Sequence, residues 1–362
     1  MKNFSSIYNK KKVLVIGHTG FKGSWLTIWL KLLGADVAGY SLYEHSKPNH
    51  FVKLNIKKKI KNFKGDITNI DKLKKKIYEF RPEIIFNLAA QPIVSESYAN
   101  PVLTYSTNVM GLVNLLQIVK KTSFVKSMVL ITSDKAYFND GRKSTYREHD
   151  LLFGEDPYSA SKSCCEIVAN SFYKSFYQKS NCHICTVRAG NVIGGGDWAK
   201  NRLVPDLFRN WTKNKIAEIR NPNSTRPWQH VLEPIGAYLL IGKMMLERKK
   251  DLNGQAFNFG PKGNQNFSVI DLVRLFQNKW KNKKFKVLKS KSKFKEEKLL
   301  RLSNKKAKNI LGWSPVLNKN QFIEFTLQWY KDYPHNNTFK YSSEQIYKYL
   351  ETAKERKLKW IK

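Results

Sequence analysis

The sequence has few acidic residues. Only 28 of its 362 residues are Asp or Glu, against 65 Lys and Arg, so the formal net charge is +37. Such a surplus suits a polyanionic partner, but charge reports on association and not on fold. The lysine runs at 57–59, 72–76 and 279–308 are spread over both halves of the chain and form no single basic stripe. We therefore expect a lysine-rich solvated surface and no nucleic-acid partner.

The sequence is also poor in cysteine and lacks long apolar runs. Cys164 and Cys165 are neighbours, and Cys182 and Cys185 have no second pair of metal ligands at zinc-finger spacing. In a strand, residues 182 and 185 would face opposite sides, so we expect neither a disulfide framework nor a metal site. We find no signal-peptide pattern and no apolar stretch of about 18 residues. These absences predict a cytoplasmic protein without a membrane segment.

Strand and helix patterns alternate through the first half of the chain. They lie at 13–16, 21–33, 37–40, 70–80, 84–86, 103–121, 128–131, after Pro157 and at 184–187. This alternation is typical of an α/β fold with a Rossmann-type doubly wound parallel sheet. Beyond residue 190 the alternation breaks at glycine and proline loops. We expect a cofactor-binding domain over 1–190, a smaller C-terminal substrate-binding lobe over 191–340 with segments returning to the first domain, and a tail over 341–362.

A glycine-rich loop joins the first predicted strand to the first predicted helix. In GHTGFKG, Gly17 can make the tight turn, Gly20 admits a pyrophosphate and Gly23 lets the helix pack closely. The N-terminus of the helix attracts the anion. We therefore predict that this loop holds a dinucleotide through Gly17, His18, Thr19, Gly20, Phe21, Lys22 and Gly23.

The second predicted strand ends without the acidic residue that commonly binds the ribose hydroxyls of NAD. Ser41 stands there, and no arginine is present to bind a 2′-phosphate, so NAD and NADP both stay open on this evidence. Asp66 is a candidate for the adenine amino group or for a helix cap. His18 is large for its place in the loop, so it either crowds the pyrophosphate or points to solvent.

A tyrosine and a lysine four residues apart open the predicted helix after Pro157. Tyr158 and Lys162 lie on one face of that helix, and Asp156 can cap it. A nearby ammonium lowers the pKa of a phenol, which can then act as a base. Other tyrosine–lysine pairs share the spacing, but only this one follows a strand-end serine, Ser133, by 25 residues. Ser133 can hydrogen-bond a reacting hydroxyl.

These features together resemble the extended short-chain dehydrogenase/reductase superfamily. Longer segments resemble the CDP-glucose 4,6-dehydratases within it. They are GHTGFKGSWL at 17–26, ITSDK at 131–135, DPYSASK at 156–162, RAGNVIGGGDWA at 188–199 and RPWQHVLEP at 226–234. The resemblance implies a homo-oligomeric enzyme with NAD that converts CDP-glucose to CDP-4-dehydro-6-deoxyglucose.

The resemblance also implies residue roles. Ser133, Tyr158 and Lys162 would serve oxidation at C4, while Asp134 as acid and Lys135 as candidate base would serve loss of water across C5 and C6. Further cofactor contacts would be Ser41, Asp66, Ile67, Ala89, Ala90 and Asn108. Substrate contacts would be Gln91, Asn191, Arg202, Arg226, Trp228 and His230. The two arginines suit a diphosphate or ion pairs with carboxylates.

Two other functions stay open at this point. A nucleotide-sugar 4-epimerase would share Ser133, Tyr158 and Lys162 but would have no use for Asp134 and Lys135 at C5 and C6. A redox-sensing or polyanion-binding protein on a Rossmann scaffold would use the net charge of +37. No motif distinguishes cytosine from other bases, so the CDP moiety rests on the resemblance alone.

Overall fold

The computed structural model describes residues 2–42, 46–248, 252–262, 266–288 and 299–361. Within these residues a seven-stranded parallel sheet runs in the order β11-β6-β5-β4-β1-β2-β3. The strands are β1 (Lys12–Ile16), β2 (Asp36–Ser41), β3 (Lys61–Lys64), β4 (Ile84–Asn87), β5 (Ser127–Ile131), β6 (His183–Ala189) and β11 (Gln255–Phe259). The predicted doubly wound sheet is confirmed.

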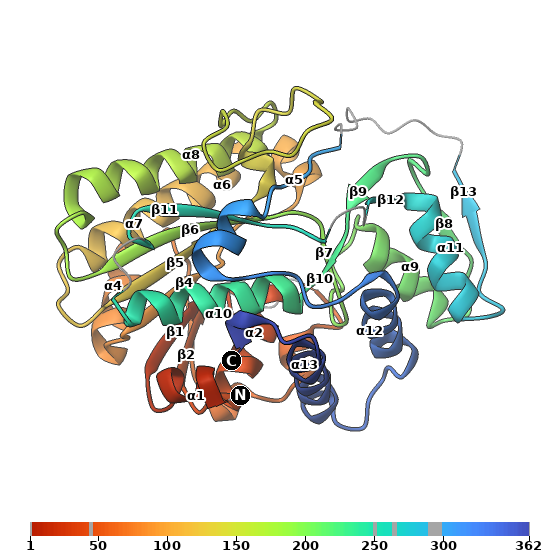
Figure 1. The fold of residues 1–362 in the computed structure, drawn as a ribbon, viewed down its shortest axis with the longest axis horizontal. Coiled ribbons are helices and arrows are strands. Elements are labelled where there is room, and N and C mark those ends of the chain that lie inside the picture. Colours follow the sequence, from red (N-terminus) through yellow and green to blue (C-terminus); the bar gives the residue numbers. More distant parts are fainter. Residues whose placement is uncertain (1, 43–45, 249–251, 263–265, 289–298, 362) are drawn as a thin grey trace.

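Helices cover both faces of this sheet (Figure 1). One face carries α2 (Phe21–Leu32) and α10 (Leu232–Leu246), and the other carries α4 (Ile70–Phe80), α7 (Gly111–Val119) and α8 (Pro157–Phe172). Alternate strand residues supply the two cores, because side chains along a strand point to opposite sides. Cys185 belongs to the first core and Cys182 to the second, as their spacing predicts.

A smaller lobe lies beyond the carboxyl ends of the strands, on the right in Figure 1. Two short sheets and three helices build most of it. They are β8 (Ala217–Ile219) with β13 (Phe285–Val287), β9 (Thr225–Pro227) with β12 (Asn266–Ser268), and α9 (Leu203–Trp211), α11 (Val269–Lys279) and α12 (Lys319–Lys331). The pair β7 (Val192–Ile193) and β10 (Gln229–His230) links the lobe to the sheet. Between these segments the chain returns to the main sheet as β11.

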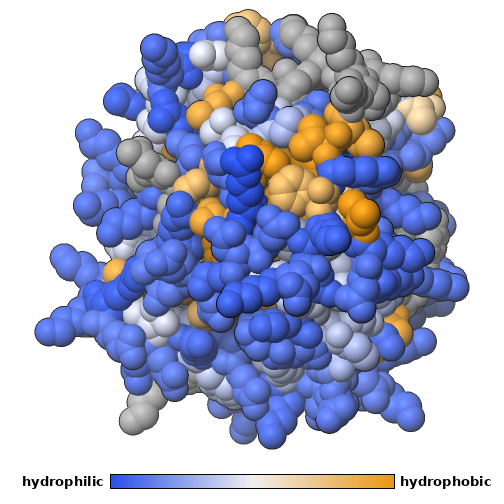
Figure 2. Space-filling view, turned by 90° about the vertical axis from the view of Figure 1, so that its right-hand side faces the viewer, coloured by the Kyte–Doolittle hydropathy of each residue, from blue (hydrophilic) through white to orange (hydrophobic). Residues whose placement is uncertain are grey.

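The outward face of the lobe is mostly hydrophilic, with hydrophobic side chains gathered in one area (Figure 2). Elsewhere the lysines at 57–59 are exposed, as predicted, and so are most of those at 72–76. Residues 289–298 of the third lysine run lie outside the described residues. The charge of the chain is thus dispersed over the described surface.

The C-terminal segment differs from the expected tail. Most of it forms α13 (Thr338–Glu355), which packs beside α2. The ring centroids of Tyr349 and Trp29 are 5.7 Å apart, and Ile346 is fully buried. Apolar residues three and four apart give α13 a buried face, and this face fastens the chain end to the first domain.

One helical run contradicts the expectation that the chain has no apolar stretch of about 18 residues. It combines α6 (Pro101–Tyr105), the π-helical turn η2 (Ser106–Met110) and α7, and its length and composition would allow it to cross a membrane. Leu112, Leu115 and Leu116 are buried in the second core. We therefore assign the α7 part of the run to the core of the domain, while Val102, Leu103 and Met110 in its first half are exposed.

The remaining short elements connect these parts. They are α1 (Lys2–Tyr8), α3 (His50–Lys53), η1 (Lys57–Lys59), α5 (Val94–Ala99), η3 (Asp134–Ala136), η4 (Tyr173–Tyr177), η6 (Ala307–Leu311) and η7 (Lys359–Ile361).

Candidate active site

The glycine-rich loop has the geometry of a phosphate cradle. Gly17 has a φ of +88°, and a Cβ there would lie 2.8 Å from the backbone nitrogen of Ala89. A Cβ on Gly23 would lie 2.1 Å from the carbonyl oxygen of Gly17. Among the described residues no side chain caps α2 at Gly20, so the N–H groups of its first turn are available to an anion. These residues fit the pyrophosphate of a dinucleotide.

His18 does not point to solvent, so that alternative is wrong. Its ring is 1% exposed and lies between β2 and Phe51. Nδ1 is 2.9 Å from the hydroxyl of Ser41, and Nε2 is 2.6 Å from Oδ1 of Asn62. A Cβ on Gly39 would lie only 2.2 Å from the ring, so this glycine makes room for His18. The loop is thereby fastened to the ends of β2 and β3.

The other expected cofactor residues line the ends of neighbouring strands. Asp66 Oδ1 accepts a hydrogen bond from the N–H of Thr68 at 2.8 Å, so one carboxylate oxygen closes a turn. Ile67 is buried beside Gly111. Ala89 follows β4 and touches the loop at Gly17. Ala90 follows it and is partly buried.

Gln91 and Asn108 hold each other. The N–H of Gln91 donates to Asn108 Oδ1 at 2.7 Å, and Asn108 Nδ2 donates to Ser161 Oγ at 2.8 Å. The Gln91 side chain donates to Thr104 and accepts from the N–H of Ile93. This bonding gives both residues a positioning role between β4, η2 and α8, with the Gln91 amide occupied on both ends.

The strand-end serine and the acid beside it face each other. Ser133 Oγ donates to Asp134 Oδ1 at 3.0 Å and accepts from the N–H of Lys135 at 3.2 Å. Ser133 is 7% exposed and Asp134 is 6% exposed. A Cβ on Gly190 would lie 2.9 Å from Asp134 Oδ2, so a glycine on the next strand end leaves space for this carboxylate.

Two contacts fasten the 132–136 segment to α8 on the side of Lys162. Ser163 Oγ donates to the carbonyl of Ala136 at 2.8 Å, and the Thr132 hydroxyl donates to Glu166. Asp156 caps the helix by accepting from the N–H of Ser159 at 3.0 Å. The structure therefore brings the Ser133 segment and the start of α8 together, as the sequence predicts.

Tyr158 and Lys162 are buried but have open polar ends. Tyr158 is 9% exposed and Lys162 is 4% exposed. Within the described part of the chain, neither the phenol oxygen nor the ammonium has a hydrogen bond or an ion pair. A buried ammonium without a partner costs free energy, so its partner is expected in a ligand.

Lys22 connects the loop to this site electrostatically. Burial, together with the positive charges of Arg202 and Lys162, lowers the pKa of Lys22 to about 8, against the attraction of Asp134 and Asp197. The Lys22 ammonium in the glycine-rich loop is therefore close enough to Asp134, Lys162 and the 197–202 loop for their charges to act on it. Lys22 was expected only as a cofactor contact, and its position beside Lys162 and Asp134 needed the structure.

The two arginines expected at the substrate are partly engaged. Arg202 Nη1 lies 3.2 Å from Asp197 Oδ2, so the ion-pair alternative holds for one nitrogen. Arg226 Nη1 donates to the carbonyl of Thr225 at 2.9 Å. The strand of Arg226 runs close to Asp134, because a Cβ built on Gly190 would lie 3.7 Å from Pro227 and 2.9 Å from Asp134 Oδ2.

Asn191, Trp228 and His230 lie along the link to the lobe. The carbonyl of Asn191 accepts from the N–H of Gln229 at 3.0 Å. Trp228 Nε1 donates to the carbonyl of Phe267 at 3.1 Å, which holds β12 in place. His230 is fully buried beside Trp25 and Phe325, and burial lowers its pKa to about 3. This ring belongs to the core and presents no face to a substrate.

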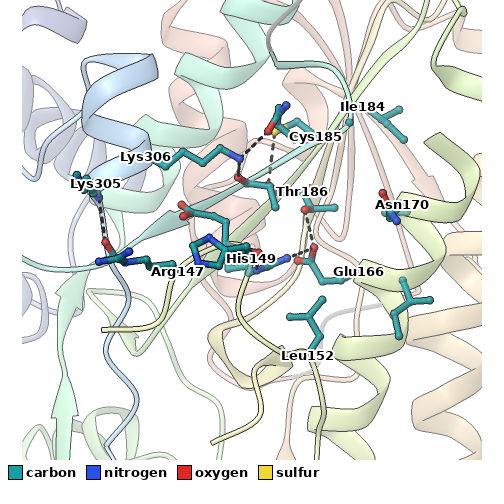
Figure 3. A pocket seen from close by; sticks show the side chains of 18 of the residues that line it. Arg147, His149, Leu152, Glu166, Asn170, Ile184, Cys185, Thr186, Lys305 and Lys306 are labelled. Atoms are coloured by element: carbon teal, nitrogen blue, oxygen red, sulfur yellow. Dashed lines mark hydrogen bonds and ion pairs between the residues drawn. The ribbon is translucent and has the colours of Figure 1, made fainter. Parts of the chain in front are cut away.

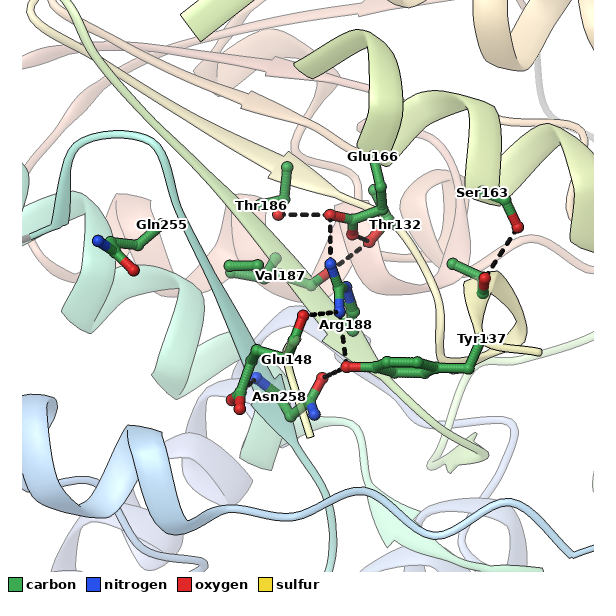
Figure 4. Close-up of polar contacts among 12 residues, drawn as sticks. Thr132, Tyr137, Glu148, Ser163, Glu166, Thr186, Val187, Arg188, Gln255 and Asn258 are labelled. Carbon is green, nitrogen blue, oxygen red and sulfur yellow. Dashed lines mark hydrogen bonds and ion pairs between the residues drawn. The ribbon is translucent and has the colours of Figure 1, made fainter. Parts of the chain in front are cut away.

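A buried network next to the site escaped the sequence reasoning. Arg188 Nη2 lies 2.9 Å from Glu166, and Arg188 Nη1 donates to Tyr137 Oη at 2.6 Å (Figure 4). Burial alone would raise the pKa of Glu166, but Arg188 and the hydroxyls of Thr132 and Thr186 hold it below its usual value. In the sequence, the one sign of this network is the position of Glu166, four residues after Lys162.

Comparison with known proteins identifies the family of this chain. The family model described as GDP-mannose 4,6 dehydratase matches residues 14–326. A curated relative, the CDP-glucose 4,6-dehydratase of Salmonella typhimurium, is 42% identical over 335 residues, which cover 91% of this chain and 92% of the relative. The chain belongs to this dehydratase family.

Solved structures share the fold of this chain. The epimerase Mth375 of Methanothermobacter thermautotrophicus superposes with a TM-score of 0.80 at 23% identity, over 95% of this chain and 97% of that one. The dTDP-glucose 4,6-dehydratase of Bacillus anthracis, solved in complex with NAD, gives a TM-score of 0.74 at 22% identity, over 89% and 97%.

Proposed function

We propose that the protein is a CDP-glucose 4,6-dehydratase, which converts CDP-glucose to CDP-4-dehydro-6-deoxyglucose and water. The observation that carries the proposal is the Ser133–Asp134–Lys135 segment, which hydrogen bonds hold beside α8, the helix that carries the buried Tyr158 and Lys162. The 42% identity to the Salmonella enzyme supports the choice of substrate.

NAD fits the glycine cradle, and when bound it supplies a hydride acceptor for C4 and a hydride donor for C6. Gly17, Gly20 and Gly23 would admit the pyrophosphate, with Ser41 and Asp66 at the strand ends toward the adenosine. Lys162 would bind the ribose of the cofactor, since its buried ammonium has no partner among the described residues. These assignments use the residues that the structure brings to one end of the sheet.

Oxidation at C4 needs a base on the hydroxyl group. Tyr158 takes this proton in our proposal, because the ammonium of Lys162 on the next turn stabilises the phenolate. Ser133 donates a hydrogen bond to the same oxygen and orients it. Its present bond to Asp134, 3.0 Å long, places the hydroxyl in the site.

Loss of water needs an acid and a second base. Asp134, which is 6% exposed, would protonate the departing 6-hydroxyl. Lys135 is the next residue and is half-buried. It would take the C5 proton, which the neighbouring 4-ketone makes more acidic. Both groups lie on η3, so one short turn carries the chemistry that distinguishes a dehydratase from an epimerase.

The substrate diphosphate would meet the loops of the smaller lobe. Arg202 and Arg226 would bind it, because guanidinium groups suit bidentate phosphate binding. Asn191 and Trp228 would complete this wall. We propose a homo-oligomer acting in the cytoplasm, which agrees with the four free cysteines among the described residues.

Mass spectrometry of the reaction with CDP-glucose tests the proposal. A product lighter by one water supports the dehydratase, and an unchanged mass with an altered sugar would support a 4-epimerase in its place. A parallel panel of CDP-, UDP-, dTDP- and GDP-glucose tests the base, with CDP-glucose expected to give the highest kcat/KM. A polyanion-binding protein would form neither product, and its binding to DNA would depend steeply on the salt concentration.

A further inference from the structure

A cavity of about 690 Å³ lies at the β11 edge of the main sheet. Its walls are α8, β6, β11, the 147–152 loop and residues 303–309 (Figure 3). None of Ser133, Asp134, Tyr158 and Lys162 lines it. Its volume is in the range of small-molecule sites, which is roughly 300–1,000 Å³. The cavity is therefore separate from the active site and large enough for a ligand.

Small side chains keep this part of the sheet uncovered. Helix α8 presents Ala169 toward the cavity, and β11 and the residue before it present Ala256 and Gly254. A larger apolar residue at Ala169 or Ala256 would fill part of this space, and Gly254 is required by its φ of +77° and by the Tyr173 ring, which would lie 2.3 Å from a Cβ there. The hollow thus follows directly from the sequence.

Cationic side chains group at one side of the cavity. Figure 3 shows Arg147, His149, Lys305 and Lys306 together there, with Ile184 and Asn170 at the other side. Among the described residues, the side chains of Arg147, His149 and Lys305 form no hydrogen bond or ion pair. These three groups are available to an anion.

The two carboxylates of the lining are already occupied. Glu148 Oε1 accepts from the N–H of Asn258 at 2.9 Å. Glu166 is paired with Arg188 at 2.9 Å and accepts from Thr186 at 2.8 Å. The charge of Glu166 is therefore compensated by Arg188, whereas Glu148 has a neutral donor and acts electrostatically on the ammonium of Lys306.

We propose that this cavity is a second ligand site that takes a small organic phosphate. The phosphate would lie on Arg147 and Lys305, and the organic body would cover Leu152 and Ile184. A phosphate monoester on a sugar or a nucleoside has this combination of a compact anion and a less polar body. The proposal is independent of the nucleotide sugar that the active site turns over.

The wall of the cavity leads to the catalytic segment. Arg188 Nη1 donates to the carbonyl of Glu148 at 3.0 Å, and the same group bonds Tyr137, which follows η3. Glu166 accepts from Thr132, the residue before Ser133. A ligand that shifts the 147–149 loop therefore acts through Arg188 and Glu166 on both ends of the 132–137 segment, and should change kcat.

Calorimetry on protein saturated with NAD and CDP tests the site, because CDP blocks binding of the probes at the active site. The probes are glucose 1-phosphate and CMP, with inorganic phosphate as the fragment. We expect at least one organic phosphate to bind at one equivalent per chain. The double variant Arg147→Ala/Lys305→Ala should weaken it about tenfold, which corresponds to about 1.4 kcal/mol.

Lys308→Ala is the matched control, because Lys308 is exposed on the adjacent turn and does not line the cavity. Equal binding by wild type and double variant, or no binding of either organic phosphate, would overturn the site. Equal affinity for inorganic phosphate would overturn the role of Leu152 and Ile184. A kcat that the bound probe leaves unchanged would overturn the link to the catalytic segment.

Discussion

Two buried cations on neighbouring elements have opposite surroundings. Arg188 on β6 bonds Glu166, Tyr137 and the carbonyl of Glu148, so only its Nε lacks a partner. Lys162 on α8, one turn before Glu166, has no protein partner among the described residues. An unpaired buried charge is expensive, so a protein retains one where a ligand completes it. The difference separates a structural charge from a functional one.

The same contrast holds for two buried carboxylates. Glu166 has the guanidinium of Arg188, and its pKa lies below the usual value although burial opposes this. Glu233 on α10 has mainly neutral donors: the N–H groups of Val316 and Leu317 and the hydroxyl of Tyr349. Burial raises the pKa of Glu233 to about 7. A full-charge partner, and not the number of hydrogen bonds, decides the direction.

Removing the open phenol should produce the largest effect. Tyr158→Phe should lower kcat by roughly 10²–10⁴-fold, since the base on the C4 hydroxyl is lost. The free energy of unfolding should change little, because the phenol oxygen has no partner in the described structure. Steady-state kinetics and urea unfolding measure the two. Tyr347→Phe, at an exposed tyrosine of α13, is the control.

Breaking the ion pair between Arg188 and Glu166 should mainly lower the free energy of unfolding. Arg188→Met leaves Glu166 buried without its cation, and should lower the free energy of unfolding by about 3–5 kcal/mol. Adding Glu166→Leu should recover part of this loss, because no uncompensated charge remains. Urea unfolding of the single and double variants measures both. A stable Arg188→Met protein would contradict the structural role of this charge.

Asp134→Asn should separate the two stages of the reaction. The amide cannot protonate the departing 6-hydroxyl, so formation of the dehydrated product should slow by about 10²–10³-fold. Oxidation at C4 should persist, since Tyr158, Lys162 and Ser133 remain. Acid quenching followed by mass spectrometry should therefore recover a 4-keto sugar that still holds its 6-hydroxyl. Equal loss of both stages would remove Asp134 from the acid role.

The smallest expected effect is the contribution of Glu233 to the free energy of unfolding, and this contribution depends on pH. Its folded pKa of about 7 lies above the ordinary value of 4.5, so the folded state binds the proton more tightly. The stabilisation is complete below about pH 4.5 and is lost as the pH rises through 7. Unfolding free energy should thus fall between pH 5 and pH 8, by about 3 kcal/mol at most. Glu233→Gln should flatten this part of the curve.

Local patterns predicted much of this molecule. The glycine loop, the strand-end serine and the tyrosine–lysine pair are defined by short spacings, and the structure brings them to one end of the sheet as expected. Glu166 and Arg188 lie 22 residues apart in sequence, and their contact depends on how α8 packs on β6. The burial of His18 and His230 likewise depends on partners from distant strands and helices. Sequence patterns alone do not specify such contacts.

One experiment in deuterated water tests the central claim most directly. CDP-glucose is converted by the protein with NAD, and the sugar product is examined by mass spectrometry and proton NMR. The account predicts a product that has lost one water and gained one solvent deuterium in place of hydrogen at C5, because the C5 proton is removed and replaced in the site. A product of unchanged mass without deuterium at C5, as a 4-epimerase would give, would contradict it.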